Sequence, residues 1–143
     1  ANLSWAQNEA WPTKPIQLIL GFPPGGPNDL VARALALRLS DQLKQQVVVE
    51  NRAGAGGIIG AQAVARAKND GYTLLMGNIG PNAINYSLYK ELPYKASDFA
   101  PITQMVRIPN VLVMNADTAK KLNITNLKDF IAYAKVHCDA KIC

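Results

Sequence analysis

The chain has 143 residues, of which 49% are hydrophobic and only 17% are charged. This composition indicates a globular protein rather than a disordered one, and the length suits one domain, or one domain with part of another. The formal charge is +5, but the lysines and arginines are scattered and not interleaved with aromatic residues, so we expect no nucleic-acid binding. No apolar run approaches the ~18–20 residues that cross a bilayer.

The first predicted strand covers residues 16–20 and leads through a Gly- and Pro-rich loop into a helix over 30–43, with Pro27 suited to the first helical position. Apolar residues recur in this helix at helical spacing, which predicts a broad buried face. They form two rows: Leu30, Ala34 and Leu37, and Val31, Leu35 and Leu39.

Two more strand–loop–helix units follow. Residues 46–50 contain three consecutive valines, which predicts a strand buried on both faces; a glycine loop over 51–57 and a helix from 58 to about 68 come next. The third unit has a strand over 72–76, a loop over 77–82 and a short helix from about 83 to 89. Three such repeats predict an α/β fold with a doubly wound parallel sheet and right-handed crossovers.

The rest of the chain is predicted to be less regular. Two apolar strands are expected over 102–106 and 111–114, and a last helix from 127 to about 136. Asn126 and Asp129 have the spacing of a capping box at the start of that helix, with shorter side chains than usual.

The loops that follow the three strands share one property: they are rich in Gly, Pro and Asn and poor in charge. Parallel strands bring such loops to one edge of the sheet, where ligands of open α/β proteins bind. Unpaired backbone N–H groups and the helix dipole favour an anion there. Asp29 complicates this prediction, since its charge opposes a bound anion unless the side chain braces a neighbouring loop amide; the sequence leaves both alternatives open.

Catalytic and metal sites are not indicated, and we expect neither enzymatic activity nor a cofactor. The run from Gly54 to Gly60 misses the dinucleotide-binding spacing because Ile59 stands where the third glycine belongs, and no P-loop is present. The one histidine, His137, lies at the end of the chain and offers no triad base. With Cys138 and Cys143 it makes too small a set for metal, which leaves a short-loop disulfide, an intermolecular disulfide or free thiols.

Several motifs together resemble a known family. They occur in the order Gly21-Phe22-Pro23-Pro24-Gly25-Gly26-Pro27-Asn28-Asp29, residues 47–57 (VVVENRAGAGG), residues 70–75 (DGYTLL) and Asp98-Phe99-Ala100-Pro101. The chain is similar, from about Trp11 to Lys135, to the extracytoplasmic solute-binding receptors of tripartite tricarboxylate transporters, also called the Bug or TctC family.

The resemblance implies a type II periplasmic-binding-protein fold, in which two α/β lobes close on a small carboxylate for membrane transporter subunits. It places 13–105 in the first lobe and 106–143 in an incomplete second lobe. Residues 1–12 are expected to be a lead left by a removed signal peptide, because Ser4-Trp5-Ala6 has the small-x-Ala form of a cleavage site. The resemblance further implies that backbone amides and water of two loops hold the ligand. The residues concerned are Phe22, Pro24, Gly25, Gly26, Asn28, Asn78, Ile79, Gly80, Asn82 and Ala83.

Two hypotheses follow from this resemblance, because members of the family are considerably longer than this chain. The first is a carboxylate-binding receptor, or a truncated portion of one, in the periplasm. The second is a truncated interaction module that no longer transports and that pairs as a homodimer through its incomplete lobe, with open sheet edges and apolar faces covered by a second copy.

Overall fold

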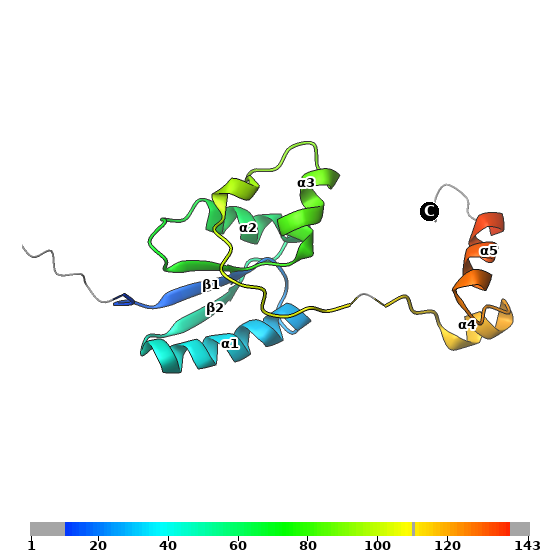
Figure 1. Cartoon of the computed structure of the whole chain (residues 1–143), viewed down its shortest axis with the longest axis horizontal. Coiled ribbons are helices and arrows are strands. Elements are labelled where there is room, and N and C mark those ends of the chain that lie inside the picture. Colours follow the sequence, from blue (N-terminus) through cyan, green and yellow to red (C-terminus); the bar gives the residue numbers. More distant parts are fainter. Residues whose placement is uncertain (1–10, 110, 138–143) are drawn as a thin grey trace, which may run out of the picture. The chain divides into compact units, whose positions relative to one another are not determined.

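The structure, a computed structural model, describes residues 11–109 and 111–137. It divides into two compact units, Ala1–Pro101 and Ile102–Cys143 (Figure 1). The expected lobe boundary after residue 105 lies shortly beyond this division, whereas most of the expected lead and both cysteines lie outside the described residues.

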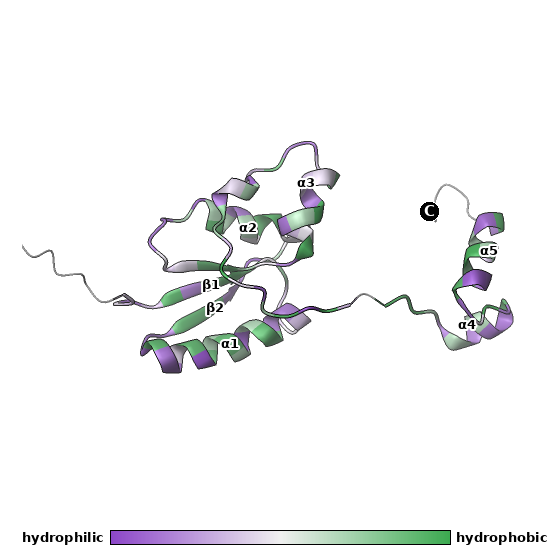
Figure 2. Ribbon diagram, in the orientation of Figure 1, coloured by the Kyte–Doolittle hydropathy of each residue, from purple (hydrophilic) through white to green (hydrophobic). Residues whose placement is uncertain are grey.

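A three-stranded parallel sheet forms the centre of the first unit, as predicted. Its order is β2-β1-β3, with β1 at Ile16–Leu20, β2 at Val47–Asn51 and β3 at Thr73–Met76. Figure 2 shows the hydrophobic colour of β1 and β2 between the helices. The middle strand is buried on both faces, whereas β2 is an edge strand on which Val48 is 41% exposed. The prediction that the three valines are buried on both faces was therefore wrong for Val48.

Two helices cover opposite faces of the sheet, α1 at Pro27–Leu43 and α2 at Ile58–Ala65 (Figure 1). Side chains of a strand alternate between its faces. Ile16, Leu18 and Leu20 accordingly share one core cluster with residues of α1, and Ile19, which is 1% exposed, turns to the side of α2. The doubly wound arrangement is confirmed, although α2 ends a few residues before the predicted end at about Lys68.

The buried face of α1 differs from the predicted one. Ala32 and Ala36 are buried in the core cluster with strand residues, and Leu35 and Leu39 are partly buried against that cluster. Leu30 and Leu37 of the other predicted row are 65% and 67% exposed, and Ala34 is exposed as well. That row was wrong because two alanines let the helix backbone approach the strands, which turns the larger leucines outward.

After β3 the chain enters a π-helical turn, η2 at Gly80–Ile84, which continues as α3 at Asn85–Leu88 where a short helix was predicted. A 3-10 turn, η3 at Ala96–Asp98, follows. Between them Tyr94 is 4% exposed, and its hydroxyl donates to the Pro81 carbonyl oxygen at 2.8 Å. This bond fastens the returning chain to the segment that follows β3.

The second unit contains two helices, α4 at Ala116–Lys121 and α5 at Leu127–His137. Asn126 accepts hydrogen bonds from the backbone N–H groups of Lys128 and Asp129, as the capping-box prediction required. The return bond differs: the Asp129 carboxylate accepts from the N–H of Thr125, one residue before the cap. Helix α4 was not predicted.

The two strands predicted around Arg107 were wrong. Residues 102–109 and 111–115 contain no strand, and Ile102, Val111 and Val113 are 79%, 75% and 81% exposed. Apolar, β-branched residues favour an extended backbone, but a strand also needs a neighbour for its N–H and C=O groups. None of the described helices has the length and hydrophobicity to cross a membrane.

Candidate functional site

Three loops leave the carboxyl ends of the parallel strands and therefore share one edge of the sheet. We name them loop 1 (residues 21–26), loop 2 (residues 52–57) and loop 3 (residues 77–80). Loops 1 and 2 meet at Gly57, where a Cβ would lie 3.1 Å from Phe22 Cε2 and 3.0 Å from Cγ of Pro81, the residue after loop 3. Loop 3 itself approaches loop 2, since a Cβ on Gly80 would lie 3.7 Å from the Gly56 carbonyl oxygen. In addition, Asn85 Nδ2 donates to the Gly56 carbonyl oxygen at 3.3 Å. The predicted gathering of the loops is confirmed.

Glycine is required where these loops touch. Gly57 has φ 88°, a conformation that favours glycine. A Cβ on Gly60 would lie 2.7 Å from Gly21 Cα, so α2 starts directly against the end of β1. The close helix–strand contact is therefore made at Gly60, one residue after Ile59, the position that the dinucleotide-binding spacing reserves for glycine.

Asp29 lies at the first turn of α1 and is 3% exposed. Its carboxylate accepts hydrogen bonds from the N–H of Gly25 at 3.0 Å, from Arg33 Nε at 2.9 Å and Nη2 at 3.0 Å, and from Asn51 Nδ2 at 3.0 Å. The same Asn51 amide group donates to the Phe22 carbonyl oxygen at 3.0 Å. Asp29 thus braces loop 1, which answers the question that the sequence left open.

These bonds also set the charge state of the carboxyl group. The pKa of Asp29 is held well below its ordinary value of 3.8, mainly by the hydrogen bonds from Arg33 and then by those from Gly25 and Asn51. In turn, the carboxylate raises the pKa of the Arg33 guanidinium. Asp29 is therefore ionised and forms an ion pair with Arg33.

Loop 3 satisfies much of its own hydrogen bonding. The N–H of Asn78 donates to Asn82 Oδ1 at 3.2 Å, and the N–H of Gly80 donates to Asn78 Oδ1 at 3.0 Å. The N–H of Asn82 reaches the Asn78 carbonyl oxygen at 3.2 Å. These amides are therefore engaged within the loop, and Ile79, 65% exposed at its tip, presents an apolar surface.

The predicted ligand-binding residues differ in what they can donate. Pro24 has no N–H group, and the N–H of Gly25 is already bound to Asp29. At the start of α1, no side chain caps the first turn, so the N–H groups of Asn28 and Asp29 lack a capping partner. Asn28 Nδ2 is buried without a hydrogen-bond partner among the described residues. The strongest donors at this edge therefore lie at the amino end of α1.

The structure places the remaining predicted residues on loop 1, in loop 3 or directly after it: Phe22, Gly26, Asn82 and Ala83.

Arg33 and Asn85 were not predicted as part of this edge, and Asn51 was predicted there only as the first residue of the loop over 51–57, not as a partner of Asp29. The (i, i+4) spacing of Asp29 and Arg33 was a usable signal, because residues four apart are neighbours on a helix. Asn51 ends a parallel strand, where polar side chains meet the loops. Asn85 had no such signal, since its contact depends on the π-helical turn before it.

Comparison with known proteins identifies the family. The model of the tripartite tricarboxylate transporter family receptor, TctC, matches residues 31–142. Protein BugT of Bordetella pertussis is 46% identical over 129 residues, which cover 89% of this chain and 38% of that protein. The chain belongs to the TctC receptor family.

Solved structures of TctC-like folds agree with this membership. One, titled R. palustris Rpa4515 with adipate, has a TM-score of 0.76 at 38% identity and covers 89% of this chain and 42% of that one. Another, MatC from Rhodopseudomonas palustris with bound malate, has a TM-score of 0.72 at 29% identity and covers 90% and 43%. The chain thus spans about two fifths of the length of these relatives. The predicted periplasmic-binding-protein-like fold is confirmed.

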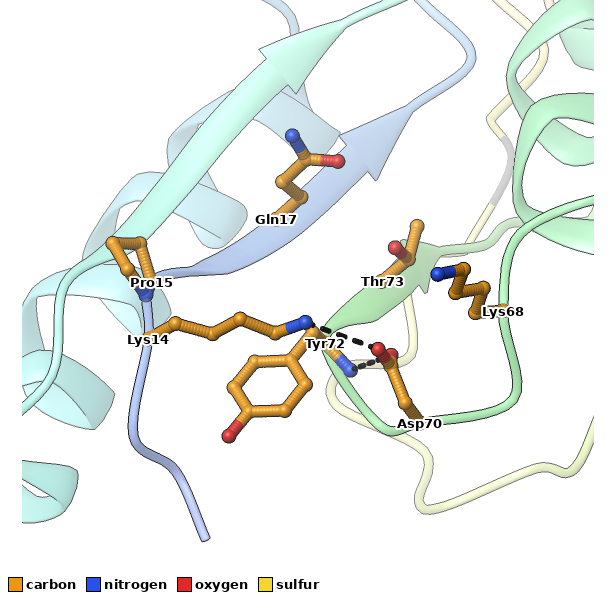
Figure 3. Close-up of a pocket in the computed structure, with 7 residues that line it drawn as sticks. All are labelled: Lys14, Pro15, Gln17, Lys68, Asp70, Tyr72 and Thr73. Atoms are coloured by element: carbon orange, nitrogen blue, oxygen red, sulfur yellow. Dashed lines mark hydrogen bonds and ion pairs between the residues drawn. The ribbon is translucent and has the colours of Figure 1, made fainter.

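A separate surface hollow of about 270 Å³ lies at the opposite, amino-terminal edge of the sheet (Figure 3). Two of its charged groups pair with each other: Lys14 Nζ lies 3.2 Å from Asp70 Oδ2 and 4.3 Å from the centre of the Tyr72 ring, and Asp70 also accepts from the Tyr72 N–H. We therefore interpret it as a tie between the start of β1 and the turn before β3. The described residues contain no group of three or more His, Cys, Asp and Glu side chains that could hold a metal ion.

Proposed function

We propose that the chain is part of a periplasmic solute-binding receptor, not an enzyme, and that it holds a small organic carboxylate at the edge formed by loops 1–3. The receptor would pass this acid to the membrane subunits of a tripartite tricarboxylate transporter. Two solved relatives carry adipate and malate, both small dicarboxylic acids. The ligand of this chain is expected in the same chemical class.

One observation carries the proposal: the amino end of α1 combines uncapped N–H groups with the buried, unpartnered Nδ2 of Asn28. Helix amino ends stabilise anions through these N–H groups and the helix dipole. A buried donor without an acceptor costs free energy that a ligand oxygen would recover. A carboxylate supplies oxygens of the right kind.

Our assignment of Ala1–Pro101 as the main part of the first lobe rests on the division of the chain. In this proposal loops 1 and 3 provide one side of the site, through Phe22, Gly26, Asn28, Ile79 and Ala83. Three predicted amides, those of Gly25, Asn78 and Gly80, hold the loops in shape instead, since they already donate within them.

Nuclear magnetic resonance titration tests the proposal on the chain as it exists. Adipate and malate are expected to shift the backbone signals of loop 1, loop 3 and the first turn of α1, with weak affinity because one open edge leaves the ligand in contact with water. Adipamide, the neutral diamide of adipate, is the control and should shift them much less. Equal shifts with the diamide, shifts confined to the hollow around Lys14, or no shifts at all would contradict a carboxylate site.

An interaction module is the second candidate, and one observation favours it. Eight large apolar residues in the first part of the second unit are 39–81% exposed: Ile102, Met105, Val106, Ile108, Val111, Leu112, Val113 and Met114. A second copy of the chain would cover such surface. Sedimentation velocity over a range of concentrations, with and without reductant, tests for the homodimer, and a monomer at every concentration excludes it.

A further inference from the structure

The Asp29 carboxylate, the Arg33 guanidinium and the Asn51 amide form a closed ring of hydrogen bonds. Arg33 Nη2 donates to Asp29 Oδ1 at 3.0 Å and to Asn51 Oδ1 at 3.2 Å, and Asn51 Nδ2 donates to Asp29 Oδ1 at 3.0 Å. We call these three residues the polar ring. It joins the first two turns of α1, which carry Asp29 and Arg33, to the end of β2, where the pairing of Asn51 with Leu20 of β1 holds the third member in place.

The polar ring reaches loop 1 at two points. Asp29 accepts from the N–H of Gly25, and Asn51 donates to the carbonyl oxygen of Phe22. Loop 1 is thus held at both ends of its Phe22–Gly25 turn, one end through a donor and the other through an acceptor. Without the ring, the turn would be restrained mainly by the fixed φ angles of its prolines, because its glycines leave the backbone free.

The ring also resolves an electrostatic conflict. A buried carboxylate in the first turn of α1 would repel a carboxylate ligand at the same helix end, and such repulsion is strong where water is excluded. The Asp29 side chain is 4% exposed, whereas that of Arg33 is 53% exposed. The cation therefore neutralises the buried anion from the solvent side and leaves the helix end free for a second anion.

We propose that Arg33 is a positioning residue of the carboxylate site, which it makes receptive to an anion by cancelling the charge of Asp29 while Asp29 and Asn51 hold loop 1. This inference rests on the proposed function. Arg33 itself does not touch the ligand in this scheme. Its effect on affinity comes through the charge balance of the polar ring.

Calorimetric titration with adipate separates charge from geometry through four variants. Arg33→Gln removes the charge and should weaken adipate binding about ten-fold. Arg33→Lys keeps the charge but loses the bidentate contact with Asp29, and its affinity for adipate should stay within about three-fold of that of the natural chain. Asp29→Asn combined with Arg33→Gln removes both charges and should recover most of the loss. Arg38→Gln, on the same helix and also exposed, controls for the loss of a positive charge in general.

Several results would overturn the proposal: equal affinities of Arg33→Gln and Arg38→Gln, an Arg33→Lys variant as weak as Arg33→Gln, or no recovery in the double variant. Circular dichroism on each variant shows whether it is folded before its affinity is compared. If the natural chain binds no carboxylate, the proposed function fails and the charge-cancelling role fails with it. Whether the polar ring holds loop 1 is tested separately by hydrogen exchange of the Gly25 amide, which should be slow in the natural chain and faster in Asn51→Ala and Asp29→Ala.

Discussion

Gly60 in α2 and Gly21 at the end of β1 are in backbone contact: a Cβ on Gly60 would lie 2.7 Å from Gly21 Cα, and one on Gly21 would lie 2.8 Å from Gly57 Cα. Gly21 thus occupies the space that a side chain on Gly60 would need, and Gly57 occupies the space that a side chain on Gly21 would need. The contact fixes the start of α2 over the end of β1 and brings loops 1 and 2 together.

Gly60→Ala is expected to lower the free energy of unfolding by about 1–3 kcal/mol, because the added methyl group must push two backbone segments apart. Urea unfolding followed by circular dichroism measures the change. Gly26→Ala is the matched control, since a Cβ there has its nearest neighbour at 3.9 Å and φ is −80°. Similar midpoints for the two variants would show that α2 can shift without cost.

Tyr94→Phe is expected to lower the free energy of unfolding by about 1–2 kcal/mol, because it leaves the Pro81 carbonyl oxygen without its hydroxyl donor in a buried place. The ring stays, so its edge-to-face contacts with Tyr86 and Phe99 are preserved. Tyr89→Phe, at a tyrosine that is 41% exposed, should leave the unfolding midpoint nearly unchanged. A Tyr94→Phe variant as stable as this control would contradict a role of the bond in holding the returning chain.

We expect the lowered pKa of Asp29 to make the folded chain less stable in acid. Its pKa is lowered in the folded chain, so below about pH 5 the unfolded chain takes up a proton that the folded chain does not, and unfolding becomes easier as the pH falls. Asp29→Asn should therefore flatten the dependence of the unfolding free energy on pH in this acid range. Asp41→Asn, on the exposed side of the same helix, should keep the slope of the natural chain. Parallel curves for the natural chain and Asp29→Asn would contradict the lowered pKa.

Asn28→Asp is expected to abolish measurable adipate binding, because it replaces the unpartnered Nδ2 donor with a negatively charged acceptor of almost the same shape. Resonance titration with adipate measures the effect. Asn69→Asp adds the same charge in the turn before β3, at the opposite edge of the sheet, and should bind like the natural chain. Unchanged adipate binding by Asn28→Asp would show that the ligand carboxylate does not bind at the start of α1.

Sequence patterns predicted the first unit better than the second for a physical reason. Strands such as Ile16–Leu20 are defined by apolar runs that end in glycine-containing loops, and their partner strands all lie within residues 16–76. Around Val111, the same kind of apolar run has no described neighbour to pair with, so the backbone stays extended without becoming a strand. An apolar sequence pattern shows that a segment favours an extended backbone, whereas a sheet forms only when a second segment pairs with it.

The sequence predicted the position of the candidate site but not the hydrogen bonds within it. Glycine, proline and asparagine after each strand located the edge, and the family resemblance selected loops 1 and 3. The hydrogen bond that occupies the Gly25 amide could not be read from the sequence, because it depends on the rotamer of Asp29 and on Asn51, twenty-two positions away.

The two units differ in how firmly each segment is anchored. In the first, the middle strand contributes three side chains that are at most 1% exposed; in α4 and α5 no residue is fully buried. A protease added in small amounts would accordingly cut first within 102–109 or 111–114, where the residues are exposed and outside any helix or strand, and would release a sheet-containing core that still carries all three loops.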